Sequence, residues 1–151
     1  MHLFIAGPDE GNYKIQLNQM IRQLEIECNI TFTGMVLGEK KSELLAAADI
    51  FVLTSHQEGD SMAVKEAMAA ALPVIITPAC HFSEVESSQS GFVVFPAIEE
   101  ILQTLKRIAL DEHRKDMGIR GKSLIVKSYT WEKIIGQLMD KYESVCNNHI
   151  K

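Results

Sequence analysis

Residues 50–77 read IFVLTSHQEGDSMAVKEAMAAALPVIIT, and this stretch decides the fold class. It opens with the apolar run at 50–53 and closes with a second apolar run at 74–77, which Pro73 introduces. Each run has the length and composition of a strand buried in a sheet. The alanine- and methionine-rich segment between them, residues 63–72, is predicted to be a helix that packs closely on that sheet. Short apolar strands that alternate with helices predict a parallel sheet.

The same alternation continues on both sides of this stretch. Further strands are expected at residues 3–6, 30–34 and 92–95, and further helices at 12–28, 42–48, 98–108, 112–127 and 131–145. The pattern therefore predicts an α/β fold, a Rossmann-like three-layer sandwich with one parallel sheet covered on both faces, ending in a helical segment. Because no repeat or low-complexity linker interrupts it, residues 1–151 are expected to form a single domain.

The overall composition is typical of a globular domain. The chain has 151 residues, of which 46% are hydrophobic, and its net charge is -5 from 20 acidic and 15 basic residues. A domain of this length buries a sizeable core without disulfides or a metal. No run of Lys and Arg is present, so a nucleic acid is not an expected partner. No apolar stretch approaches the ~18–20 residues of a membrane span, and the first residues do not resemble a signal peptide. A soluble, cytoplasmic protein is expected.

The cysteines and histidines give no sign of a metal site. Three cysteines stand far apart, and neither they nor the five histidines have the spacing of metal ligands. We expect no metal or other cofactor, and a reducing compartment. Cys28 and Cys146 are expected to be buried or half-buried small hydrophobic residues, as free cysteines usually are.

The candidate site follows the strand at 50–53, because ligands of open parallel sheets bind beyond the carboxyl ends of the strands. Glu58 lies in the loop there, and Glu66 lies eight residues later in the helix. The unpaired amides at the start of that helix suit a phosphate, and Glu66 is placed to accept hydrogen bonds from a ribose diol beside it. Spacing alone is equally compatible with a simpler interpretation, in which Ser61 caps the helix and Glu66 is a solvated helix residue.

The segment from Glu58 to Ala69, followed by residues 72–75 (LPVI), resembles the E-x7-E signature and the next strand of group 1 (GT4-type) retaining glycosyltransferases. These enzymes have the two-domain GT-B fold. Other segments are similar to the C-terminal domain of that family in the same order: 4–8 (FIAGP), 30–34 (ITFTG), 48–55 (ADIFVLTS), 84–85 (EV), 90–93 (SGFV) and 129–131 (YTW). The resemblance covers nearly the whole chain and implies the C-terminal half of a GT-B fold, the nucleotide-sugar donor domain.

The resemblance also implies roles for individual residues. Glu58 would be the catalytic residue, contacting the hydroxyls of the transferred sugar or stabilising positive charge at its anomeric carbon. Glu66 would hold the ribose hydroxyls. The remaining donor-binding residues are the diphosphate-binding set around Gly59, Ser61, Met62 and Ala63, the base-lining residues Val36 and Leu37, and Gly7. No metal is expected, because helix dipoles and basic residues neutralise the departing diphosphate.

His56 and His81 are further candidates. Each follows a strand at the site end of the predicted sheet, so each is placed to contact the donor phosphate or sugar. The alternative for both is packing within their loops.

The chain departs from the family in the residues after Glu58. Members usually have Glu-Gly-Phe-Gly where this sequence has Glu58-Gly59-Asp60-Ser61. A carboxylate aimed at a diphosphate would be repelled, so Asp60 is expected to turn toward solvent. The serine is expected to narrow the approach of the phosphate only slightly.

The resemblance also implies parts of the enzyme that lie outside this sequence. The basic residues that clamp the diphosphate in the family precede the first strand, and the N-terminal acceptor domain is a further expected partner. This chain alone is therefore expected to have little transferase activity.

The apolar stripe at 131–145 is expected to be exposed and to favour self-association, and the intact enzyme is a candidate for peripheral attachment to a membrane. Two alternatives stay open: a non-catalytic binding or interaction module, and a related sugar phosphorylase or epimerase.

Overall fold

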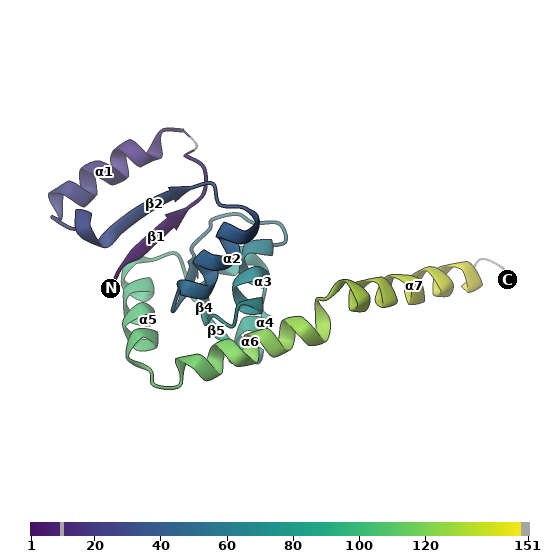
Figure 1. Ribbon diagram of the computed structural model, residues 1–151. Coiled ribbons are helices and arrows are strands. Elements are labelled where there is room, and N and C mark those ends of the chain that lie inside the picture. The colour runs from purple at the N-terminus through teal and green to yellow at the C-terminus, as the bar shows by residue number, and fades with distance from the viewer. Residues whose placement is uncertain (10, 149–151) are drawn as a thin grey trace. The chain divides into compact units, whose positions relative to one another are not determined.

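The computed structural model describes residues 1–9 and 11–148 (Figure 1). The expected α/β class with parallel strands is confirmed. The chain divides into two compact units, Met1–Leu44 and Leu45–Lys151. The strands form a two-stranded and a three-stranded parallel sheet, whereas the sequence predicted one sheet.

The first unit is built on one pair of strands. Strand β1 (Leu3–Ala6) pairs in parallel with β2 (Ile30–Gly34). Helix α1 (Tyr13–Gln23) and the short 3-10 helix η1 (Glu27–Asn29) connect them. The helix expected at 12–28 ends early because Glu25 has a φ of 55°, which a right-handed helix cannot accommodate. Helix α2 (Gly38–Ala47) follows β2 and contains the boundary between the two units.

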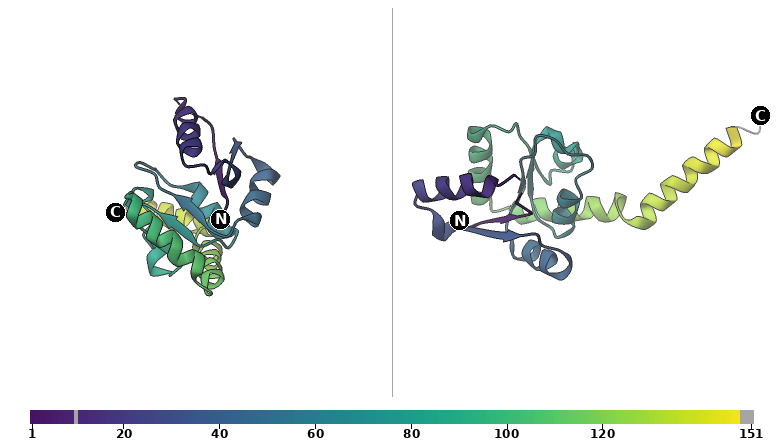
Figure 2. Two further views of the ribbon diagram at one scale, coloured as in Figure 1. Left: turned by 90° about the vertical axis from the view of Figure 1, so that its left-hand side faces the viewer. Right: turned by 90° about the horizontal axis from the view of Figure 1, so that it is seen from above.

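Helix α1 lies beside the strand pair, as the views in Figures 1 and 2 show. The ammonium of Lys14 lies 4.9 Å from the ring centre of Phe32 on β2. At the start of α1, the backbone N–H of Lys14 donates to the carboxylate of Asp9 at 3.1 Å. The expectation for Cys28 is wrong: it lies in η1 and is exposed, because the helix face that would have buried it has already ended.

The second unit contains the three-stranded sheet. Strand β4 (Val74–Ile76) is central and completely buried, with β3 (Phe51–Leu53) on one side and β5 (Gly91–Val93) on the other. Helix α3 (Met62–Ala69) connects β3 to β4, and η2 (Pro78–Cys80) and α4 (Glu84–Ser87) connect β4 to β5. The chain then continues through α5 (Ile98–Leu110), α6 (Arg114–Ser128) and α7 (Trp131–Asn148).

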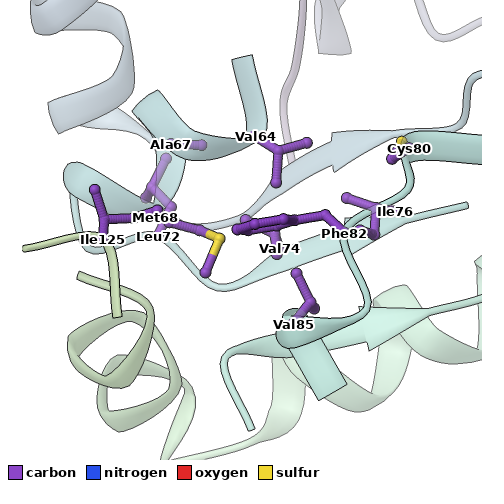
Figure 3. Close-up of a cluster of buried hydrophobic side chains, with 10 residues drawn as sticks. All are labelled: Val64, Ala67, Met68, Leu72, Val74, Ile76, Cys80, Phe82, Val85 and Ile125. Carbon is purple, nitrogen blue, oxygen red and sulfur yellow. The ribbon is translucent and has the colours of Figure 1, made fainter. Parts of the chain in front are cut away.

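The core of this unit lies between α3, the sheet and α4. Figure 3 shows Val64 and Ala67 of α3 directed toward β4, while Val85 of α4 approaches from the opposite side. Helix α6 packs at Gly118 against the turn that follows α3, where a Cβ atom would lie only 1.9 Å from the carbonyl oxygen of Ala71. The backbones therefore approach each other at a distance that only glycine allows.

Helix α7 follows α6 after a short break (Figure 2). Its apolar stripe is exposed, as the sequence predicted: Trp131 is 76% exposed and Leu138 is 48% exposed. The prediction for Cys146 is wrong, since this cysteine is also exposed on α7. Among the described residues, none of the helices has both the length and the apolar character needed to cross a bilayer.

Candidate active site

The loop between β3 and α3 carries Glu58, and two side-chain hydrogen bonds hold its first half. The hydroxyl of Thr77, at the end of β4, donates to the backbone carbonyl of Ser55 at 2.5 Å. The hydroxyl of Ser55 in turn donates to the carboxylate of Glu58 at 2.8 Å. Thr77 is buried and Glu58 is half-buried, so the carboxylate is anchored to the end of the sheet.

Helix α3 begins directly after this loop. Ser61 is its N-cap residue and is only 6% exposed, yet its hydroxyl makes no capping hydrogen bond. The carbonyl of Ser61 accepts the first helical bond, from the N–H of Lys65 at 3.4 Å. The amides of the first turn precede this bond and have no acceptor within the helix. Because Met62 and Ala63 are exposed, the positive end of the helix dipole is accessible to an anion.

The two glutamates expected at the site stand on either side of this helix start. Gly59 and Ser61 separate Glu58 from the first turn, and Glu66 lies one turn further along α3, where it is half-buried. The second unit thus carries Glu58, Gly59, Ser61, Met62, Ala63 and Glu66 along one loop and the first turns of the helix that follows it. Carboxylates that flank a set of free amides can bind an anion and neutral hydroxyls at the same time.

Asp60 is paired with a lysine that the sequence analysis missed. Its carboxylate is 72% exposed, as expected, and forms an ion pair with the ammonium of Lys65. The side chain of Lys65 itself is only 15% exposed. The five-residue separation, which crosses from loop to helix, is not a regular helical pairing, so the sequence pattern gave no signal for this contact.

Two aromatic rings hold the ammonium of Lys65 in place. It lies 5.0 Å from the ring centre of Tyr129 and 5.8 Å from that of Phe82, distances typical of cation–π interactions. The two rings meet edge to face at 5.3 Å. The hydroxyl of Tyr129 donates to the carboxylate of Glu84 at 2.9 Å. Burial, this hydrogen bond, and the nearby charges of Glu84 and Asp60 raise the pKa of Tyr129 to about 12.

The two candidate histidines have different surroundings. His81 follows η2 with a left-handed backbone, φ 50° and ψ 38°, and lines a hollow of about 350 Å³ together with Thr77 and Phe82. His56 is exposed in the loop between β3 and α3. A non-glycine residue in the left-handed region is uncommon and often marks a functional loop.

The other candidate residues lie in the first unit. Gly7 has a φ of 140° and donates its N–H to the carbonyl of Gly34 at 2.9 Å, which joins the ends of β1 and β2. Gly7 lines a second hollow, of about 520 Å³, next to Tyr13 and Lys14 of α1. Val36 is half-buried and Leu37 is exposed in the segment that leads into α2. The predicted site residues therefore form two groups, one in each unit.

Metal ligands are not grouped in the part of the chain that the structure describes. Within residues 1–9 and 11–148, no cluster of three or more His, Cys, Asp or Glu side chains could hold a metal ion.

Comparison with known proteins identifies the family. The family model described as "Glycosyl transferases group 1" matches residues 1–124. The chain belongs to this family. The chain is 26% identical over 148 residues to an uncharacterised glycosyltransferase of Methanocaldococcus jannaschii, covering 93% of this chain and 36% of the relative. It is 36% identical over 81 residues to mannosylfructose-phosphate synthase of Agrobacterium fabrum, covering 51% of this chain and 18% of that enzyme.

Solved structures agree with this family assignment. HepE of Anabaena in complex with UDP superposes with a TM-score of 0.85 at 21% identity, covering 95% of this chain and 41% of HepE. The C-terminal domain of LpcC, a glycosyl transferase group 1 family protein of Francisella tularensis, superposes with a TM-score of 0.72 at 27% identity. That match covers 80% of this chain and 64% of the solved domain. The chain thus has the Rossmann-like α/β fold of one part of these GT-B enzymes and spans 41% of the length of HepE.

Proposed function

We propose that this chain is the donor-binding part of a retaining glycosyltransferase, which takes a glycosyl group from a nucleotide-diphosphate sugar and transfers it to a glycan, lipid or other acceptor. The observation that carries the proposal is the grouping of Glu58, the free amides at the start of α3, and Glu66 in one site. A nucleotide-diphosphate sugar presents an anion between two neutral polyols, and this grouping offers complementary partners in that order.

In this proposal each part of the site has one task. The amides of Ser61, Met62 and Ala63 receive the diphosphate, and the adjacent Gly59 leaves room for it, since no atom lies within 4 Å of where its Cβ would be. Glu66 accepts hydrogen bonds from the ribose diol. Glu58 is half-buried and held by Ser55, so its carboxylate is oriented to contact the sugar hydroxyls or to stabilise positive charge at the anomeric carbon.

The charge of Asp60 does not oppose this assignment. The ammonium of Lys65 lies against its carboxylate, and the pair presents far less net charge to a diphosphate than a lone carboxylate would. We propose that the helix dipole and nearby cations replace a metal ion in neutralising the departing diphosphate. His56 and His81 are further proposed donor-binding residues of the second unit. Gly7, Val36 and Leu37 are the proposed donor-binding residues of the first unit.

Similar proteins support a nucleotide-sugar donor. HepE, which shares the fold, has been solved with UDP and with UDP-glucose. A relative of Xanthomonas oryzae that is 26% identical over 143 residues is named GDP-mannose:cellobiosyl-diphosphopolyprenol alpha-mannosyltransferase. Because the chain spans only 38% of that relative, we propose that the acceptor-binding domain and full transfer activity require sequence beyond this chain. The exposed stripe of α7 is the proposed surface for self-association of the isolated chain.

A calorimetric titration tests the proposal. The chain is titrated with UDP, GDP and ADP, with their common sugar conjugates and with inorganic phosphate, and the titration is repeated with Glu66→Ala. As a matched control, Glu112→Ala removes an exposed carboxylate that lies just before α6. The proposal requires that one nucleotide binds, that Glu66→Ala weakens it about tenfold or more by removing charge-assisted hydrogen bonds, and that Glu112→Ala does not. Binding of inorganic phosphate alone would instead favour a phosphorylase, and binding of none of these ligands would favour an interaction module.

A further inference from the structure

Asp60 and Lys65 occupy two related positions around the start of α3. Ser61 is the N-cap, so Asp60 is the residue immediately before the cap and Lys65 is the fourth residue of the helix. In many helices these two positions hold an apolar pair, called the hydrophobic staple, which fixes the angle at which the chain enters the helix. Here the same two positions hold an ion pair.

The usual polar devices do not fix this helix start. The hydroxyl of Ser61 makes no capping hydrogen bond, and the third helical residue is Val64, which cannot return a bond to the backbone of the cap. The Asp60–Lys65 contact is therefore well placed to determine how the loop joins the helix. Lys65 is a rigid anchor for it, because the rings of Tyr129 and Phe82 hold the ammonium and leave the side chain only 15% exposed.

The other end of the loop is fixed by Thr77 and Ser55, so Glu58 lies between two anchors. We propose that Asp60 and Lys65 form an electrostatic staple that positions the Glu58 loop against the N-terminus of α3 and holds the charge of Asp60 in a neutral pair beside the phosphate position. Both are positioning residues. The consequence for donor binding rests on the proposed function, whereas the ordering of the loop does not.

The test uses a double-mutant cycle of the whole chain. Lys65→Met keeps the stem but removes the charge, Asp60→Phe removes the carboxylate, and the double variant Asp60→Phe/Lys65→Met restores an apolar staple. Lys122→Met removes an exposed lysine on α6 and serves as the control. Two quantities are measured for each variant: the rate of amide hydrogen exchange over residues 56–64, and the affinity for UDP, GDP and ADP. Both are measured at about 0.05 M and at about 0.5 M salt.

The electrostatic staple predicts how amide exchange and nucleotide affinity change in each variant. Lys65→Met speeds amide exchange in the loop about two- to fivefold, the range that loss of a partly exposed ion pair allows, and it weakens nucleotide binding. The double variant returns exchange to within about twofold of the wild type and makes it insensitive to salt. Lys122→Met changes neither quantity.

Two results would overturn the inference: unchanged exchange over residues 56–64 in Lys65→Met, or a double variant whose exchange is the sum of the two single effects. Failure of the proposed function is a separate result, in which the wild-type chain binds none of the three nucleotides. The exchange measurement then still decides whether the staple orders the loop.

Discussion

The hydroxyl of Tyr129 donates a hydrogen bond to the carboxylate of Glu84 at 2.9 Å, and the two residues lie 45 positions apart in the chain. This bond joins the end of α6 to the start of α4. It also orients the ring that lies beneath the ammonium of Lys65, 5.0 Å from the ring centre. A residue far from the E-x7-E segment therefore supports the helix on which we propose the donor site.

The pKa of Tyr129 gives a prediction for alkaline pH. The phenol keeps its proton to about pH 12 in the folded chain but loses it near 10 when unfolded. Since the folded state holds this proton more tightly, the free energy of unfolding is expected to fall as pH rises from about 10 to about 12. Tyr129→Phe should remove this component of the pH dependence. Absorbance titration should show one of the three tyrosines of the chain ionising later than the others, and a single common transition would contradict the prediction.

The contact between α6 and the turn after α3 predicts a large effect of one methyl group. Gly118→Ala places a Cβ atom 1.9 Å from the carbonyl oxygen of Ala71, so either α6 or this turn must shift. We expect a loss of about 1–3 kcal/mol in the free energy of unfolding, as for other overpacked sites. Gly136→Ala on α7 is the matched control, because no atom lies within 4 Å of its added Cβ. It is expected to be neutral or to stabilise the helix by up to about 1 kcal/mol. Equal losses in both variants in urea denaturation would contradict the packing account.

The exposed stripe of α7 predicts that the isolated chain self-associates. Ile135 and Leu138 are 53% and 48% exposed, and burying them against a second copy removes apolar surface from water. We expect the mass measured by analytical ultracentrifugation to rise with concentration. Ile135→Glu/Leu138→Glu should abolish the rise, while Lys141→Glu on the same helix should not. A monomer at every concentration would contradict this part of the proposal.

Much of the fold could be predicted from local sequence patterns. Strand β2 has the limits that its apolar residues predicted, Ile30–Gly34, and the stripe of α5 predicted its helix to within a few residues. Both predictions depend only on the spacing of apolar residues, which can be read directly from the sequence. The division into two sheets could not be predicted, because the residue pattern of a strand does not show which other strand it pairs with.

The parts of the site that escaped prediction depend on contacts between distant segments. Glu58 and Glu66 carry a recognisable spacing, whereas the ion pair of Asp60 depends on the direction of one lysine side chain and on two rings that support it. The left-handed backbone conformation of His81 could not be predicted either, since histidine has only a weak preference for the left-handed region. Short elements such as α4 carry too few residues for a period to be recognised.

Nuclear magnetic resonance shows whether a nucleotide diphosphate binds at the start of α3. Backbone amide shifts of the labelled chain are followed during titration with UDP, GDP and ADP. We expect the largest changes on the amides of Ser61, Met62, Ala63 and Val64, which lie at the positive end of the helix. Saturable changes centred on α5 or α7, with these four amides unmoved, would contradict it.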